Sequence, residues 1–170
     1  MTDQTSYLCR CCGQHHDALP FSYGSPAPAY WSDDLAADER SVLGEEQCII
    51  QGQQFFVRAR IVIPVTDADT EFDWGVWVSL SQPNFQRMSE LWTTPGREQE
   101  PSYFGWLSTE IPLYQPTTLN LKTRVHSQPV GIRPIVELEP TDHALAVEQR
   151  TGITLSRVQQ IAEELLHPRT

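Results

Sequence analysis

Two long stretches of alternating apolar residues constrain the fold of this chain more than any other feature. Every second residue is apolar from Phe55 to Val65, and the same is true from Phe72 to Leu80. A period of two is typical of a β-strand that buries one face. Because only the short polar segment "TDADTE" separates the stretches, they predict an antiparallel hairpin at the centre of a sheet.

The apolar faces of these two strands also predict how they pair. We expect Ile61 to lie opposite Val76, because a shift by one residue would turn the apolar set toward solvent. The same register places Arg60 opposite Trp77 on the outer face, where a guanidinium group can lie over an indole ring.

The other patterned segments surround this hairpin. Apolar residues at helical spacing predict helices at 32–43, 83–92, 142–150 and 153–165, and further alternation predicts strands at 117–126 and 132–138. Strands in the middle of a chain with helices near its ends are typical of the α+β class. We therefore expect one domain over residues 1–170, with an antiparallel β-sheet and flanking helices.

The charge of the chain limits its partners. Twelve Lys and Arg residues stand against 22 Asp and Glu residues, a net charge of −10, and Lys122 is the single lysine. Such a field repels phosphate groups, so we expect no binding to nucleic acid. The most acidic segment, residues 33–46, is typical of a solvated helix face and its flank, and a docking surface for a basic protein partner is the alternative.

The N-terminus and the apolar runs predict the compartment. "MTDQTSYL" lacks the basic and apolar regions of a signal peptide, and no apolar run approaches the length that spans a bilayer. We expect a cytoplasmic protein without membrane contact. In a reducing compartment, clustered cysteines indicate metal binding or thiol chemistry rather than disulfides.

The segment "CRCCGQHH", residues 9–16, is the one dense cluster of such residues. A Cys-x-x-Cys pair followed by glycine forms the turn of a zinc knuckle, in which two thiolates converge on one ion. This N-terminal zinc-knuckle-like turn supplies half of a site. The remaining ligands must come from His15 or His16 and from a distant residue, either Cys48 or one of the histidines at 126, 143 and 167.

Several stretches together resemble a known bacterial family, the domain of unknown function 2199. They are CxxCGxxH at the start, FFVRARIVIPV, FDWGVWVSLSQPNF, YFGWLS, TLNLKTRVH and IRPIVELEPTDHALAVEQRTGIT. The resemblance runs from about residue 8 to residue 167 and implies no activity, substrate or partner. It implies that Cys9, Cys12, His16 and the later Cys48 correspond to recurrent positions of the family.

We therefore predict one structural zinc ion bound by Cys9, Cys12, His16 and Cys48, within the N-terminal segment 9–48. His15 could replace His16, and Cys11 is expected to point away from the metal as a free thiol. Cys48 is the remaining cysteine and precedes the first long strand, which would anchor it to the core.

The function predicted from these residues is protein interaction rather than catalysis. No nucleophile elbow, phosphate-binding loop or paired carboxylate accompanies the cysteines, so we do not expect an enzyme. A metal-dependent hydrolase remains an alternative and would need an open coordination position. A helix-turn-helix regulator is the other alternative, because Gly152 separates the last two helices, although residues 142–170 are not basic.

Overall fold

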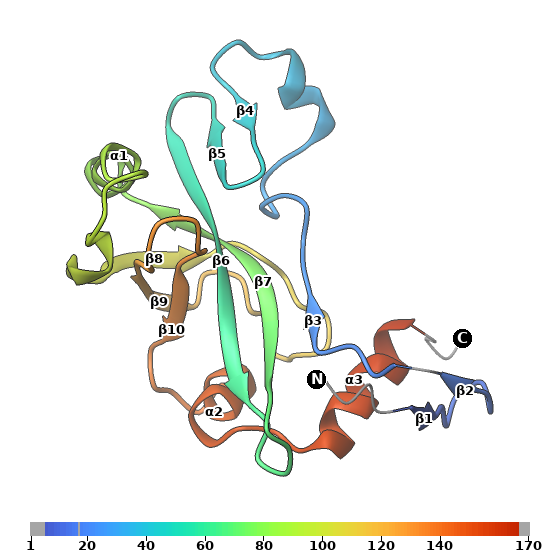
Figure 1. Cartoon of the computed structure of the whole chain (residues 1–170). Helices are drawn as coiled ribbons and strands as arrows, with labels where there is room; N and C mark the ends of the chain where they lie inside the picture. Colours follow the sequence, from blue (N-terminus) through green and yellow to red (C-terminus); the bar gives the residue numbers. More distant parts are fainter. Residues whose placement is uncertain (1–5, 17, 167–170) are drawn as a thin grey trace.

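The predicted hairpin is the central element of the fold. The computed structural model describes residues 6–16 and 18–166. β6 (Gln54–Pro64) and β7 (Glu71–Leu80) pair antiparallel from one end to the other and run through the middle of the molecule (Figure 1). Their apolar faces are buried as the alternation predicts, with Ile61, Ile63, Phe72 and Val76 fully enclosed.

The register differs from the prediction by two residues. Ile61 lies opposite Trp74 instead of Val76, because the strands continue pairing up to Pro64 and Glu71 and leave a tighter connection. A shift of two keeps every side chain on its predicted face, so the apolar pattern cannot detect it.

The shift changes which arginine meets the indole of Trp77. Arg58, not Arg60, lies opposite Trp77, with its guanidinium carbon 5.6 Å from the ring centroid. Arg60 instead forms an ion pair with Asp73 of the neighbouring strand. The predicted cation–π contact between Arg60 and Trp77 is therefore wrong. Arg58, two residues earlier in β6, makes this contact instead.

The sheet closes into a five-stranded barrel. β7 pairs with β8 (Tyr103–Leu107), β8 with β9 (Lys122–His126), and β9 with β10 (Ile135–Leu138), all antiparallel. β10 then pairs with β6 in parallel, where Ile135 lies opposite Arg60. The expected purely antiparallel sheet is thus corrected to a mixed barrel. Closure pairs backbone N–H and C=O groups that an open sheet would leave exposed at its edges. The apolar alternation cannot predict this pairing, because it joins strands that are distant in the sequence.

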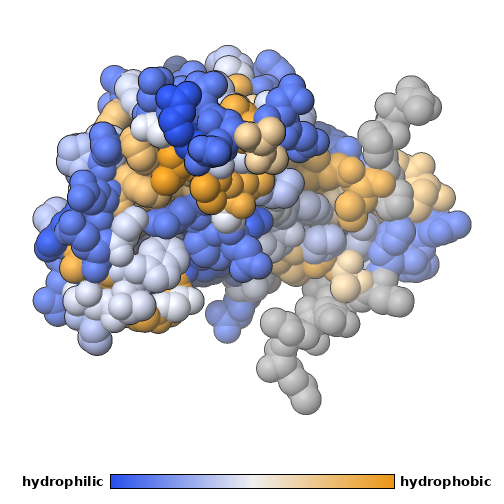
Figure 2. All heavy atoms as spheres, turned by 90° about the horizontal axis from the view of Figure 1, so that it is seen from above, coloured by the Kyte–Doolittle hydropathy of each residue, from blue (hydrophilic) through white to orange (hydrophobic). Residues whose placement is uncertain are grey.

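Shorter strands extend the sheet beyond the barrel. β3 (Ser22–Tyr23) lies parallel to β7, and β5 (Gln47–Ile50) pairs with the first part of β6. β4 (Val42–Leu43) forms the outer edge. Viewed from above, the end of the molecule that carries β4 and β5 shows an apolar band among hydrophilic residues (Figure 2). Exposed Val42 and Leu43 belong to this end.

The helix predicted at 32–43 is wrong. Residues 33–37 form a short 3₁₀ helix, η1 (Asp33–Ala37), and Ser32 makes no side-chain cap. Val42 and Leu43 lie in β4 because they pair with Ile49 and Cys48 of β5. Strand pairing therefore overrides the helical spacing of these apolar residues.

The outer face of the hairpin supports a second, smaller core. Trp77, Phe56, Cys48 and Ile50 are buried together there, beneath half-buried Trp31 and Leu35. The indole N–H of Trp77 donates to the carbonyl of Ser25 at 2.9 Å. The proline-rich segment, residues 18–31, therefore packs over the outer face of the hairpin.

Three α-helices are found in the described part of the chain. α1 (Gln82–Glu90), the helix predicted at 83–92, begins at a Ser81 cap and buries Phe85 and Met88; η2 (Arg97–Gln99) follows it. Trp92, at the end of the predicted helix 83–92, lies beyond α1 and is 37% exposed. α2 (Ala144–Thr151) and α3 (Leu155–Leu166) lie below the barrel and match the predicted pair (Figure 1). None of these helices is long and apolar enough to cross a bilayer.

Gly152, between α2 and α3, gives a test of this packing. Its φ is +81°, and an added Cβ would lie 2.7 Å from Thr66 Cγ2 and 2.8 Å from the Pro64 carbonyl oxygen. We expect Gly152→Ala to lower the free energy of unfolding by about 3 kcal/mol, because left-handed strain and a backbone clash combine.

Gly131→Ala is the matched control. Gly131 has φ +90° and no atom within 4 Å of an added Cβ, so we expect a loss of about 1–2 kcal/mol from backbone strain alone. Urea unfolding followed by circular dichroism measures both variants. Equal destabilisation of the two would contradict the close approach of Gly152 to Pro64.

Candidate metal centre

A small hairpin at the N-terminus holds the cysteine and histidine cluster. β1 (Tyr7–Leu8) pairs antiparallel with β2 (His15–His16), which places Tyr7 opposite His16. The turn between them is closed by a hydrogen bond from the Gly13 N–H to the Cys9 carbonyl at 2.9 Å. Gly13 has φ +72°, a conformation that favours glycine and lets the chain reverse tightly.

Three of the predicted ligands converge on this turn. The sulfur atoms of Cys9 and Cys12 and a ring nitrogen of His16 all lie within 4.8 Å of one another. Cys12 Sγ is 3.3 Å from His16 Nε2, and the ring of His16 stacks on Tyr7. Tetrahedral zinc with bonds near 2.0–2.3 Å separates its donors by about 3.5–3.8 Å, so the arrangement fits with small adjustments.

The surroundings of Cys9 favour its thiolate. Burial raises the pKa of Cys9, but the hydrogen bond with the Cys11 side chain and the backbone N–H groups of Cys12 and Cys11 outweigh burial and lower it. Backbone N–H groups directed at a cysteine sulfur are the feature expected of a zinc knuckle. Because the thiolate is the form that binds metals, this geometry prepares Cys9 as a ligand.

The sequence predicted that Cys11 points away from the cluster, and this prediction is wrong. Its sulfur lies 2.9 Å from Cys9 Sγ and 3.5 Å from the Glu163 carbonyl oxygen. Cys9, Cys11 and the Glu163 carboxylate form a second group of close donors. Burial, followed by the hydrogen bond to Cys9, raises the pKa of Cys11 to about 11. The Cys-x-Cys spacing of Cys9 and Cys11 was the sequence signal for this contact.

Cys48 lies elsewhere. It occupies β5, at the upper end of the molecule in Figure 1, whereas the β1–β2 hairpin is at the lower end. Its side chain is fully buried against Trp77 and Phe56, and burial raises its pKa to about 11. The prediction that Cys48 completes the cluster is therefore corrected. The alternation of β5 directs the Cys48 side chain into the second core.

The remaining histidines are also accounted for. His143 caps α2, with Nδ1 accepting from the Leu145 N–H at 3.1 Å and Nε2 lying 2.8 Å from the Pro116 carbonyl oxygen. His15 is exposed, as expected of a neighbour of the site, and His126 lies on β9. His167 falls outside the described residues.

The hairpin docks on α3 near the other end of the chain. Arg10 donates to the Glu163 carboxylate through its backbone N–H at 2.8 Å and through Nε at 3.3 Å. Gln159 Nε2 donates to the Leu8 carbonyl at 2.9 Å. The sequence predicted α3 as a helix but not its contact with the cysteine cluster. Local patterns do not report contacts between residues this far apart in the sequence.

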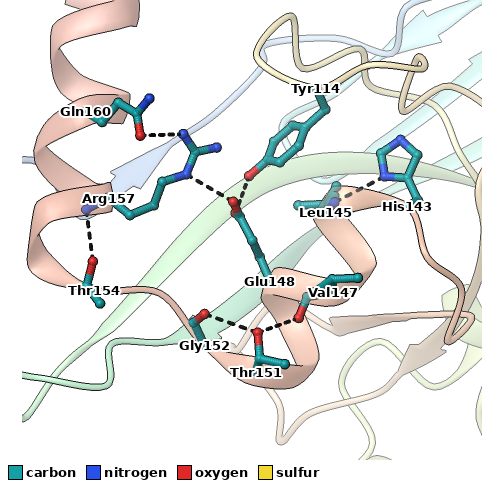
Figure 3. A network of polar contacts seen from close by, with 10 residues as sticks. All are labelled: Tyr114, His143, Leu145, Val147, Glu148, Thr151, Gly152, Thr154, Arg157 and Gln160. Atoms are coloured by element: carbon teal, nitrogen blue, oxygen red, sulfur yellow. Dashed lines mark hydrogen bonds and ion pairs between the residues drawn. The ribbon is translucent and has the colours of Figure 1, made fainter.

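A polar network joins α2 and α3 (Figure 3). The Glu148 carboxylate accepts hydrogen bonds from Tyr114 at 2.7 Å and from Arg157 at 3.0 Å. Arg157 also lies over the Tyr114 ring, 5.9 Å from its centroid. Burial and then the Glu148 charge raise the pKa of Tyr114. Arg157 therefore serves the packing of the helices.

The structure defines a small mixed β-barrel with a Cys/His cluster docked on a terminal helix. A family model described as an uncharacterized protein conserved in bacteria, the domain of unknown function 2199, matches residues 8–153. The chain belongs to this family. No curated protein and no solved structure matches it. The match begins beside Cys9, as the resemblance predicted, but ends before α3 instead of reaching residue 167.

The metal content of variants tests the cluster. We expect the wild-type protein, purified without chelator, to contain about one zinc ion per chain. Cys9→Ser and Cys12→Ser should abolish zinc content, because each removes a donor of the converging set. Elemental analysis combined with native mass spectrometry measures the stoichiometry.

Cys48→Ala is the matched control, because it removes a cysteine that the structure places in the second core. It should keep the wild-type zinc content. A wild-type protein with less than about 0.1 zinc per chain, or loss of zinc in the Cys48 variant alone, would contradict this site.

Proposed function

We propose that the N-terminal hairpin binds one structural zinc ion and that the protein acts through interaction with another protein. The observation that carries this proposal is the convergence of Cys9, Cys12 and His16 on one glycine turn. Cys11, already in contact with Cys9, supplies the fourth donor in this proposal.

The donor set favours a structural role over a hydrolytic one. Three thiols and one imidazole can close a tetrahedral shell and leave no position for water. Glu163 and α3 already cover the Cys11 side of the cluster. A metal-dependent hydrolase would need solvent in the place of Cys11, and the Glu163 carboxylate beside it already accepts hydrogen bonds from Arg10.

The location of the cluster indicates what the metal would stabilise. The hairpin is short, with two-residue strands, and such a hairpin has little stability of its own. Its contacts with Gln159 and Glu163 connect it to α3. Zinc would rigidify the turn that makes these contacts and thereby stabilise the packing of the hairpin on α3.

The last two helices do not support a DNA-reading role. Val158 and Ile161 are buried, and Arg157 is engaged by Glu148. Arg150 is exposed, but Asp142 and Glu164 share the same helical region. These features favour a packed helical pair over a regulator that neutralises phosphates.

Removal of the metal tests the structural role. We expect a strong chelator to lower the melting temperature and to increase amide hydrogen exchange in residues 7–16 and in α3, because the hairpin loses its constraint. Exchange in β6 and β7 should stay unchanged below the melting transition. Loosening of β6 and β7 without change in the hairpin would contradict the proposal.

X-ray absorption spectroscopy separates the structural and hydrolytic alternatives. We expect about three sulfur and one nitrogen neighbours around zinc, and Cys11→Ser should replace one sulfur with oxygen while weakening zinc affinity. A wild-type shell with two sulfurs, one nitrogen and one water oxygen would favour the hydrolase.

A further inference from the structure

The sulfur atoms of Cys9 and Cys11 are in direct contact. They lie 2.9 Å apart. Two thiolates bound to one tetrahedral zinc ion lie about 3.8 Å apart, and the two sulfurs of a disulfide about 2.05 Å apart. The observed distance is therefore about midway between the metal-bound and the oxidised arrangement of such a pair. Both residues are free cysteines in this structure.

The other two cysteines of the chain are placed differently. Cys12 is exposed, and its sulfur contacts His16 Nε2 at 3.3 Å. Cys48 is enclosed in the second core, at the opposite end of the molecule from the β1–β2 hairpin (Figure 1). The short contact therefore selects Cys9 and Cys11 as the pair that is ready to form a bond.

Access from solvent differs between the two sulfurs of this pair. Cys9 is fully buried, whereas Cys11 is half-buried. A small oxidant such as hydrogen peroxide therefore reaches Cys11 before Cys9. The oxidised Cys11 then has the Cys9 sulfur beside it, and this proximity makes the second step intramolecular.

We propose that peroxide converts Cys9 and Cys11 into a reversible disulfide, which removes two of the four zinc donors and releases the ion. Hydrogen peroxide transfers one oxygen to the Cys11 thiolate, which forms a sulfenic acid and a hydroxide ion. The Cys9 thiolate attacks that sulfur, so that the S–S bond forms, the S–O bond breaks and a second hydroxide ion leaves. Two electrons pass from the sulfur pair to one peroxide, and two protons from solvent complete two water molecules.

The release of zinc rests on the metal site proposed above, whereas the disulfide does not. Oxidation leaves Cys12 and His16 as donors, and two donors cannot complete the closed tetrahedral shell of a structural site. Reduction by a thiol restores the two lost thiolates. The reduced cluster therefore holds zinc and the oxidised cluster does not, which is a form of regulation at the same site.

Arg10 connects this chemistry to α3. It is the residue between the two cysteines, and its backbone N–H and its Nε donate to the Glu163 carboxylate at 2.8 Å and 3.3 Å. A disulfide closes a small ring that contains the Arg10 backbone, so the peptide group that donates to Glu163 must reorient. Oxidation therefore also loosens the docking of the β1–β2 hairpin on α3.

Peroxide treatment of the full-length, zinc-loaded protein tests the proposal. Free thiols are then blocked, and the denatured chain is digested with trypsin. Cleavage after Arg10 separates Cys9 in residues 1–10 from Cys11 and Cys12 in residues 11–40. We expect mass spectrometry to detect these two peptides joined by a disulfide, with about one zinc ion released per disulfide to a chromogenic chelator. Dithiothreitol should separate the peptides again.

Amide hydrogen exchange measures the effect on α3. We expect faster exchange in residues 7–16 and in α3 of the oxidised protein, because the contacts of Arg10 with Glu163 are weakened. Exchange in β6 and β7 should stay unchanged. Complete oxidation without faster exchange in α3 would contradict the coupling between the disulfide and the docking of the hairpin.

Variants separate the disulfide from metal binding. Cys12→Ser should lose zinc yet still join residues 1–10 to residues 11–40, because Cys9 and Cys11 remain. Cys11→Ser should slow this linkage by about tenfold or more, since it removes the neighbouring sulfur. Cys48→Ala is the matched control and should keep both the zinc content and the linkage rate of the wild type.

Three results would overturn the inference. The first is peroxide treatment that leaves the two peptides unlinked and produces sulfinic acid on Cys11 or Cys12. The second is linkage in Cys11→Ser at the wild-type rate, which would make Cys12 the partner of Cys9. The third is a disulfide that forms while zinc stays bound.

Zinc content is measured on the same samples before peroxide is added, so that the two proposals fail separately. A zinc-free wild type that still forms the disulfide would contradict the proposed metal site and leave the thiol chemistry in place. A zinc-loaded wild type that forms no disulfide would contradict this inference and leave the metal site in place.

Discussion

The pairing of β6 with β7 is the constraint on which the rest of the structure depends. These strands bury one face in the barrel, and their outer face carries Phe56 and Trp77 into a second core. β6 is long enough to pair with β5 in its first part and with β10 farther along. One hairpin therefore closes the barrel and supports the layer formed by the proline-rich segment.

The cysteine cluster depends on a different, long-range contact. The β1–β2 hairpin buries Tyr7 and the adjoining Cys9 in the main core. Glu163 and Gln159 of α3, distant in the sequence, hold it through hydrogen bonds. A thiolate-rich metal site at this junction would stabilise a hairpin and a helix together. The family match stops before α3. The helix that the cluster contacts therefore lies outside the matched region.

The barrel also explains why exposed aromatic residues gather beside β8. Residues of β8 alternate between the interior, where Tyr103 and Leu107 are buried, and the surface, where Phe104 and Trp106 remain accessible. Closure brings this outer face next to Tyr30, which comes from the segment covering the second core. A hollow thus lies where two layers meet, and no sequence motif predicts it.

The sequence by itself determined the features that depend on local pattern. The period of two defined β6 and β7 and their buried faces, and the glycine turn defined Cys9, Cys12 and His16 as neighbours, because such contacts lie within a few residues. Only the tertiary structure decided the register, the parallel β10–β6 closure and the positions of Cys11 and Cys48. A two-residue shift preserves every face, and the distance between remote residues depends on packing of the whole chain, so neither is encoded in a local pattern.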